Sequence, residues 1–245
     1  MNGNAGNPPP QCVFWDWNGT LQDDLHAAVA GTNAILSDQG KAPVDAARYR
    51  AVFSFPARGC YEALGIEVTE RNWAALCDRF FRVFSSDPSV RLFPGAEAAL
   101  RALRAAGAVQ AVVSSSERNA LESALVKYGI RDCFAEVCGQ EGAAAGSKVA
   151  AARALFARIG ADPARTWMIG DTGHDKEVAD ALGIRCLLVS SGYESSARLA
   201  SHGAPVLRSV ADVPEFFGFA PLFQTPLGGP FPTTKPRCGF PRWPK

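Results

Sequence analysis

Four short, continuous apolar runs constrain the fold of this 245-residue chain more than any other feature. Each run is preceded or followed by a stretch in which apolar residues recur at helical spacing, as at residues 121–128 and 149–159. The four runs cover residues 12–15, 109–113, 167–169 and 186–189. Buried strands that alternate with amphipathic helices are typical of a parallel sheet covered on both faces. The chain is therefore predicted to be an α/β protein with a Rossmann-like parallel sheet flanked by helices.

A long segment between the first two runs breaks this pattern. From residue 22 to residue 93 no buried strand is recognisable, and the apolar residues have helical spacing at 25–36 and again at 73–84. The segment is too long for a simple crossover between strands. We expect an inserted, all-helical domain at 22–93 and a core made of residues 11–21 and 94–217.

The two ends of the chain differ from this body in composition. Residues 1–10 are polar and end in three prolines, without the basic start and apolar stretch of a signal peptide. Residues 218–245 hold seven prolines, four glycines and four basic side chains but no acidic one. Such a segment cannot sustain a helix or a central strand. Both ends are predicted to be disordered.

Charge and cysteine content exclude several classes of partner. The chain has 25 Lys and Arg against 24 Asp and Glu, and a net charge of +1 gives no broad basic field for nucleic acid or an anionic membrane. No apolar run approaches the roughly 20 residues that span a bilayer. The seven cysteines are scattered and form no C-x-x-C pair, as expected for buried thiols in a reducing compartment. The expected location is the cytoplasm, without nucleic acid or membrane partners.

Polar side chains stand at the carboxyl ends of the predicted strands, where open parallel sheets bind their ligands. Asp16 ends the first run and Ser114 follows the second. Asp171 and Asp175 lie in the segment after the third run, and Lys148 opens the helix that leads into that run. Three carboxylates, a hydroxyl and an ammonium group are therefore expected to converge on one crevice.

This combination of groups favours phosphoryl transfer. Clustered carboxylates repel one another unless a cation joins them, and hard oxygen ligands favour Mg²⁺. A metal ion, a lysine and a hydroxyl can clamp a phosphoryl group, while a carboxylate in line with that group can act as the nucleophile.

At these residues the chain resembles the haloacid dehalogenase (HAD) superfamily, in its phosphoglycolate phosphatase-like branch with a helical cap of the C1 type. The resemblance covers residues 11 to about 210 and rests on four short motifs in the family's order, with a cap-sized insertion after the first. It implies a Mg²⁺-dependent phosphatase that hydrolyses a small phosphorylated metabolite. Asp16 is then the nucleophile that forms an aspartyl-phosphate. Asn18 offers its backbone carbonyl to the metal, and Thr20 supports the loop on the substrate side.

The same resemblance assigns the remaining polar groups. Ser114, with Ser115 beside it, holds the phosphoryl oxygens, and Lys148 tethers the nucleophile and the phosphate. Asp171 is a direct metal ligand, and Asp175 is a direct or water-mediated one. The expected catalytic residues are Asp16, Asn18, Ser114 and Lys148, and the expected metal ligands are Asp16, Asn18, Asp171 and Asp175.

Position 18 departs from the family pattern. Relatives usually carry a second aspartate there, which serves as general acid and general base. Asn18 can orient a water but cannot exchange a proton at neutral pH, and losing such a group typically costs about 10² to 10⁴ in rate. Either the leaving groups need little protonation, as in acyl or aryl phosphates, or another group protonates them, with His174, Asp23 and Asp24 as candidates. Changing Asn18 to Asp is then expected to raise turnover most for alkyl phosphates.

Two other interpretations of position 18 stay open from the sequence. The chain could be a phospholigand-binding or regulatory protein with little turnover, or Asn18 could be an introduced substitution. An abandoned site would have no reason to keep all the other polar groups together, and this favours the enzyme.

Substrate choice is expected to lie in the cap. Residues 53–61 form a loop that leads into a helix, and in capped relatives such a loop faces the active site. Arg58 in this segment could pair with a carboxylate or a second phosphate of the substrate, or it could be an exposed residue at the start of the helix. A monomer or a homodimer is expected.

Overall fold

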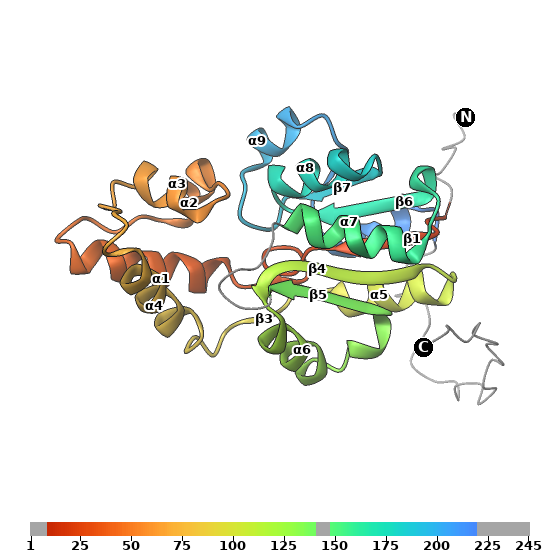
Figure 1. Ribbon diagram of the computed structural model, residues 1–245, viewed down its shortest axis with the longest axis horizontal. Coiled ribbons are helices and arrows are strands. Elements are labelled where there is room, and N and C mark those ends of the chain that lie inside the picture. Colours follow the sequence, from red (N-terminus) through yellow and green to blue (C-terminus); the bar gives the residue numbers. More distant parts are fainter. Residues whose placement is uncertain (1–8, 141–147, 220–245) are drawn as a thin grey trace.

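The computed structural model describes residues 9–140 and 148–219. It has two parts, a core built on a parallel sheet and a group of helices that projects from one end of that sheet (Figure 1). The disorder predicted for residues 1–8 and 220–245 lies outside the described residues.

The sheet of the core has six strands, ordered β5-β4-β1-β6-β7-β8, and all neighbouring strands are parallel. The strands are β1 (Cys12–Trp15), β4 (Val109–Glu117), β5 (Glu136–Gln140), β6 (Thr166–Gly170), β7 (Arg185–Val189) and β8 (Val206–Leu207). The four predicted runs are β1, β4, β6 and β7, which occupy the centre of the sheet. The two strands missed by the sequence, β5 and β8, lie at its edges and are less buried, so they lack a continuous apolar run.

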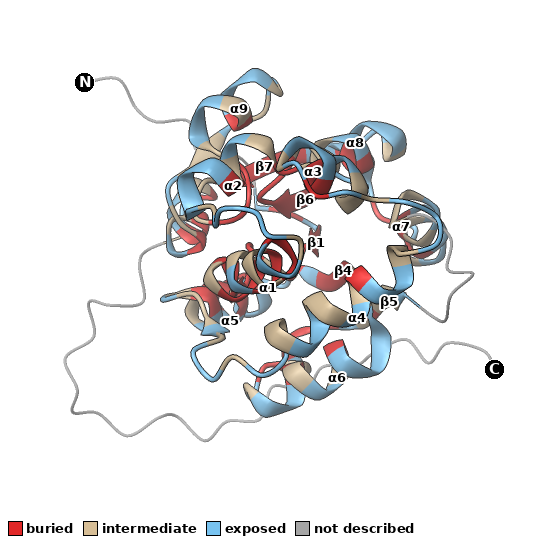
Figure 2. Ribbon diagram, turned by 90° about the vertical axis from the view of Figure 1, so that its left-hand side faces the viewer, coloured by how far each residue is buried: buried red, intermediate tan, exposed pale blue. Residues whose placement is uncertain are grey.

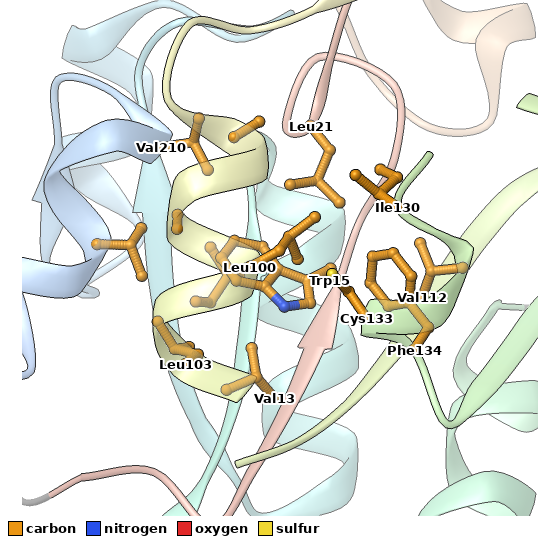
Figure 3. Close-up of a cluster of buried hydrophobic side chains, with 14 of the residues drawn as sticks. Val13, Trp15, Leu21, Leu100, Leu103, Val112, Ile130, Cys133, Phe134 and Val210 are labelled. Atoms are coloured by element: carbon orange, nitrogen blue, oxygen red, sulfur yellow. The ribbon is translucent and has the colours of Figure 1, made fainter. Parts of the chain in front are cut away.

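Helices cover both faces of this sheet, as the α/β prediction requires. The core helices are α5 (Ala96–Ala105), α6 (Arg118–Lys127), α7 (Lys148–Ile159), α8 (Gly173–Leu182), α9 (Ser196–Ser201) and α10 (Val213–Phe216), with 3₁₀ turns at Arg131–Cys133, Pro163–Arg165 and Val210–Asp212. Successive side chains of β1 point to opposite faces. Trp15 packs in a cluster with residues of α5 and α6 such as Leu100 (Figure 3), whereas Phe14 packs with residues of α7 and α8.

Four helices form the projecting part, which we call the cap. They are α1 (Leu25–Asp38), α2 (Ala46–Val52), α3 (Ala57–Ala63) and α4 (Trp73–Phe84). An antiparallel ribbon of two short strands, β2 (Gln22–Asp23) and β3 (Arg91–Leu92), joins the cap to the core. The helices expected at 25–36 and 73–84 are present as α1 and α4, which pack together. Of the two, α1 is the more deeply buried (Figure 2).

The cap also rests on the core away from this ribbon. Arg50 donates a hydrogen bond to the carbonyl of Ser191 (2.6 Å), and Arg198 donates one to the carbonyl of Phe53 (2.7 Å). The ring of Tyr193 stacks on Phe53 with centroids 4.9 Å apart. The loop after β7, together with α9, is therefore the second support of the cap.

The described ends of the chain adjoin the core. Pro10 is buried, and the carbonyl of Pro9 accepts a hydrogen bond from Arg165 (3.3 Å). At the other end the backbone N–H of Phe219 donates to the carbonyl of Pro214 (2.9 Å), and Phe219 packs against the core. The ordered core thus extends slightly beyond the limits of 11 and 217 expected from the sequence.

The cysteines of the described residues are all free thiols, and four of the six are buried. Burial raises the pKa of Cys12 to about 12 and that of Cys60 to about 11, which makes both thiols poor nucleophiles. No helix among the described residues has the length and apolar character needed to cross a membrane.

Candidate active site

Three aspartates meet at the carboxyl edge of the sheet. Asp16 follows β1, Asp171 follows β6, and Asp175 lies in the first turn of α8. Because β1 and β6 are neighbours in register, the chain leaves both strands at the same level. One carboxylate oxygen from each aspartate lies within 4.8 Å of the others, and all three residues are buried. We call this group the carboxylate cluster.

Lys148 joins two members of the cluster. Its Nζ donates to Oδ1 of Asp16 and to Oδ1 of Asp175 (2.6 Å), and its side chain is only 4% exposed. Burial alone would lower the pKa of Lys148, but the two carboxylates outweigh it and the pKa is raised. The lysine is therefore held as a cation at the first position of α7.

Asp175 is engaged at both oxygens. Besides the contact with Lys148, its Oδ2 accepts hydrogen bonds from the Thr172 hydroxyl (2.8 Å) and from the backbone N–H groups of Asp171 (3.2 Å) and Thr172 (3.1 Å). These bonds form a capping box at the start of α8. The helix that carries Asp175 thus fixes the orientation of its carboxylate.

The cluster is electrostatically unbalanced. Burial raises the pKa of Asp16 to about 6, although Lys148 partly opposes the shift. The pKa of Asp171 is raised well above its ordinary value, first by burial and then by the charges of Asp16 and Asp175. One lysine cannot neutralise three carboxylates, so the site favours an additional cation.

The loops around the cluster are shaped for close approach to the carboxylates. A Cβ on Gly19 or Gly192 would overlap Asp171, and one on Gly170 would overlap Asp175. Gly19 also has a φ of +75°, which side chains other than glycine rarely adopt. The glycines therefore let the backbone approach the carboxylates closely, and the hard oxygen donors of the cluster fit Mg²⁺.

Of the two hydroxyls predicted for the site, that of Thr20 contacts the cluster and that of Ser114 lies on β4, the strand beside β1. Thr20, which is fully buried, donates to Oδ1 of Asp171 (2.9 Å), and its hydroxyl lies 3.4 Å from Oδ2 of Asp16. Ser114 is buried, and its Oγ accepts the backbone N–H of Ser116 (3.0 Å). Strand β4 shifts register beyond Val113, so Ser114 lies where the regular ladder ends. Its neighbour, Ser115, is half-buried.

The side-chain amide of Asn18 is held at both ends. Its Nδ2 donates to Oδ2 of Asp24 (2.5 Å), and its Oδ1 accepts from the hydroxyl of Ser116 (2.6 Å). A carboxylate only accepts, so these partners fix which end of the amide is nitrogen.

Asp24 is a further buried carboxylate of this region and has no exposed surface. Besides Asn18, its donors are the side chain of Gln22 (2.9 Å), the backbone N–H of Gly19 (3.1 Å) and the hydroxyl of Tyr193 (2.8 Å). Burial raises the pKa of Asp24, and these hydrogen bonds act against the shift. The negative charge of Asp24 is therefore stabilised by hydrogen bonds from neutral donors.

The other two candidates for a replacement acid lie elsewhere. Asp23 pairs with Arg91 across the β2–β3 ribbon (2.8 Å). His174 contacts Glu177 (2.9 Å), and its ring stacks on Phe55 of the cap with centroids 5.1 Å apart. Of the three candidates, Asp24 is the one in contact with Asn18.

The structure does not bring Arg58 together with the other predicted site residues. Its guanidinium pairs with Glu70 (2.6 Å) and Glu62 (3.8 Å) and lies over the ring of Trp73 (5.8 Å). All three partners belong to the cap.

Sequence reasoning missed Tyr193, which links several parts of the site. Its backbone N–H donates to Oδ2 of Asp171 (2.6 Å), its hydroxyl donates to Asp24, and its ring packs against the cap. A signal was available, because Tyr193 follows β7 at the same sheet edge that identified Asp16 and Asp171.

A parallel sheet with a carboxylate cluster, a lysine and a serine at its strand ends, beneath an inserted helical cap, defines a class of phosphoryl-transfer hydrolases. The family model described as haloacid dehalogenase-like hydrolase matches residues 13–189, and the chain belongs to that family. It is a phosphatase of the phosphoglycolate phosphatase-like branch, a hydrolase of phosphoric monoesters.

Three similar proteins illustrate the match. The phosphoglycolate phosphatase of Synechococcus elongatus is 31% identical over 192 residues, which cover 78% of this chain and 89% of the relative. The structure of protein tyrosine kinase A from Mycobacterium tuberculosis is 25% identical, with a TM-score of 0.71 over 86% of this chain and 100% of that one. A haloacid dehalogenase-like hydrolase from Bacteroides fragilis has a TM-score of 0.73 at 16% identity, over 83% of this chain and 99% of that one, which shows the shared fold.

Proposed function

We propose that this chain is a Mg²⁺-dependent phosphatase that hydrolyses a small phosphorylated metabolite through an aspartyl-phosphate at Asp16. The observation that carries the proposal is the buried Asp16 carboxylate, held by Lys148 within the carboxylate cluster. Buried charges of this kind stabilise a fold less than well-packed apolar side chains would, so their presence favours a chemical role. The phosphoglycolate phosphatases that resemble the chain support the same reaction.

We assign Mg²⁺ to Asp16, Asp171 and the backbone carbonyl of Asn18. Asp175 fits a water-mediated contact better than a direct one, because Lys148 holds its Oδ1 and three donors hold its Oδ2, whereas each oxygen of Asp171 accepts one neutral donor. When bound, the ion supplies positive charge to the nucleophile and to the phosphoryl oxygens.

In the first step Asp16 attacks phosphorus with Oδ2, because Lys148 holds Oδ1. The new bond to phosphorus forms as the bond to the leaving-group oxygen breaks. That oxygen leaves with the bonding electron pair and takes its proton from solvent. The hydroxyl of Ser114 donates a hydrogen bond to a phosphoryl oxygen, since its Oγ already accepts the N–H of Ser116. Water then attacks the phosphorus of the aspartyl-phosphate and gives up a proton to solvent, while the bond between phosphorus and Oδ2 of Asp16 breaks. This releases inorganic phosphate and restores the Asp16 carboxylate.

Asn18 limits the range of leaving groups. Its amide can donate a hydrogen bond to the leaving oxygen but cannot deliver a proton. We therefore expect efficient turnover of aryl or acyl phosphates and slow turnover of alkyl phosphates. The same observation supports the second candidate, a phospholigand-binding or regulatory protein with little turnover.

A substrate screen separates the two candidates. Phosphate release would be measured with phosphoglycolate, an alkyl, an aryl and an acyl phosphate, each with Mg²⁺ and with excess chelator. The enzyme is expected to release phosphate from the aryl and acyl compounds only with Mg²⁺. If the protein binds these compounds but releases phosphate from none of them, the second candidate, a phospholigand-binding protein, would be the correct one.

Further expectations belong to this proposal. Thr20 and Ser115 line the phosphoryl site, and Arg58 is the cap residue expected to contact the substrate. The chain acts in the cytoplasm, in keeping with its free thiols, as a monomer or a homodimer.

A further inference from the structure

Asp24 is used in an unusual way for a residue at the start of a helix. It is the N-cap residue of α1, a position where aspartate is preferred because its carboxylate accepts N–H groups of the first turn. Here the side chain makes no such bond. The carboxylate instead lies in the core, where it accepts the four donors described above.

The contact between Asp24 and Asn18 constrains what position 18 can be. The two side-chain atoms are 2.5 Å apart, and Asp24 is fully buried. An aspartate at position 18 would bring a second carboxylate into this contact and would remove a donor from Asp24. Two like charges without a partner between them are costly in a buried site.

We propose that Asp24 is a positioning residue for Asn18, and that its carboxylate is the reason an amide stands at position 18. The Asn18 amide is held between Asp24 and Ser116, with one N–H of Nδ2 and one lone pair of Oδ1 left for the reacting groups. The orientation of the amide, rather than a proton transfer, is what this pair contributes. The inference rests on the proposed function, because it assigns Asp24 a role in that reaction.

The pair changes the outcome expected for Asn18→Asp. From the sequence alone, this substitution is expected to raise the turnover of alkyl phosphates. With Asp24 in place it creates a repulsive contact and should instead destabilise the protein. The exchange of both residues, Asn18→Asp with Asp24→Asn, keeps one amide and one carboxylate in contact and places the carboxylate at position 18.

A double-mutant cycle tests the pair. The four proteins are the wild type, Asn18→Asp, Asp24→Asn and the double exchange, and Asp38→Asn is the control, since Asp38 lies at the other end of α1 in an exposed pair with Arg79. Thermal unfolding and kcat and KM for one alkyl and one aryl phosphate would be measured for each. Additive effects are expected for independent sites and non-additive effects for a pair.

We expect Asn18→Asp to lower Tm by about 5 °C or more, and the double exchange to recover at least half of that loss. Asp24→Asn should lower kcat by about tenfold with KM changed less than about threefold, since one charged hydrogen bond to Asn18 is lost. The double exchange should raise the alkyl-to-aryl ratio of kcat by about tenfold or more, because it restores a general acid. Asp38→Asn should leave kcat and this ratio unchanged.

Two results would overturn the inference. One is a double exchange whose Tm loss equals the sum of the two single losses. The other is an unchanged alkyl-to-aryl ratio in a double exchange that is folded and active. If the wild type releases no phosphate from any compound, the proposed function fails, yet the Tm cycle still decides whether positions 18 and 24 are paired.

Discussion

The site contains buried carboxylates in two different settings. Asp16, Asp171 and Asp175 lie close enough to repel one another, and one lysine contacts Asp16 and Asp175. Asp24 lies a few residues further along the chain and is surrounded by neutral donors from the segment after β1 and from Tyr193 after β7. The first group remains short of positive charge, whereas the second is satisfied by hydrogen bonds alone.

This difference separates carboxylates that can react from a carboxylate that positions its neighbours. Unbalanced carboxylates gain from a cation and are available as ligands or nucleophiles. A carboxylate whose lone pairs are all occupied has little capacity left for chemistry, but it fixes the groups that donate to it. The two settings should therefore respond in opposite ways to substitution and to metal.

The largest expected effect is that of Asp16→Asn, which removes the nucleophile. Turnover should fall by about 10⁴-fold or more, as for other enzymes that lose their nucleophile. Because the substitution also removes one of three repelling carboxylates, Tm should not fall by more than a few degrees. Phosphate release and thermal unfolding would check both parts.

Covalent trapping makes the same test more direct. The wild type quenched with acid during turnover should carry a phosphoryl group that hydroxylamine removes. Asp16→Asn should lack this group, whereas Asp24→Asn should still carry it. Turnover of Asp16→Asn near the wild-type rate would remove Asp16 as the nucleophile and with it the contrast between the two settings.

The next effect concerns the leaving group. Because Asn18 cannot deliver a proton, aryl phosphates should exceed alkyl phosphates in kcat/KM by about 10² to 10⁴. A series of aryl phosphates with leaving groups of increasing pKa should show a steep fall in rate. Equal rates along the series would mean that some group does protonate the leaving oxygen. A purely positioning role for Asp24 would then no longer hold.

Metal binding should distinguish the two settings by stability. At Mg²⁺ concentrations about 100 times Kd, binding to the folded state should add about 2.7 kcal/mol at pH 7. Asp171→Asn should lose this increase in Tm, whereas Asp24→Asn should retain it. If Asp24→Asn also lost it, the cluster and Asp24 would form one metal site.

The same shift in Tm should depend on pH. Burial raises the pKa of Asp16 to about 6, so at pH 5 most of this carboxyl is protonated in the metal-free protein, and Mg²⁺ must displace the proton. The stabilisation by Mg²⁺ should therefore be smaller at pH 5 than at pH 7. A larger stabilisation at pH 5 would contradict the raised pKa.

The two settings also differ in how far the sequence predicts them. Asp16 and Asp171 follow buried strands and Ser114 follows the regular part of β4, so strand order alone brings them to one edge of the sheet. The contact between Asn18 and Asp24 depends instead on the path of the chain into α1 and on the loop that carries Tyr193. Nothing in the local sequence shows that the Asp24 side chain leaves its helix cap for the core.

The fold follows the same division. The central strands are continuous apolar runs because both of their faces are covered, and the sequence identifies each of them. Strands β5 and β8 have one neighbour each and a mixed pattern of burial, while β2 and β3 have two residues each. Their pairing is set by tertiary contacts, and the local sequence has no periodic apolar pattern that would reveal it.

A smaller effect is expected from Tyr193→Phe, which removes one donor from Asp24 and keeps the ring packed on Phe53. The loss of a hydrogen bond to a buried carboxylate should cost about 1.5 to 3 kcal/mol of unfolding free energy. Tyr128→Phe is the control, since its hydroxyl donates to the neutral carbonyl of Val90 (3.1 Å) and should cost only about 1 kcal/mol. Equal losses in urea unfolding would show that Asp24 is not held as a charged acceptor.

The smallest effect is expected from Arg58→Ala, which tests whether the cap adds a cation to the site. Because Arg58 is paired with Glu70 and Glu62, its removal should change KM for phosphoglycolate by less than about threefold, the range of an exposed ion pair. Arg79→Ala is the matched control, since Arg79 forms a similar exposed pair with Asp38. A KM at least tenfold higher for Arg58→Ala alone would show that Arg58 leaves its partners to bind substrate. Charge compensation at the site would then extend into the cap, beyond Lys148 and the metal.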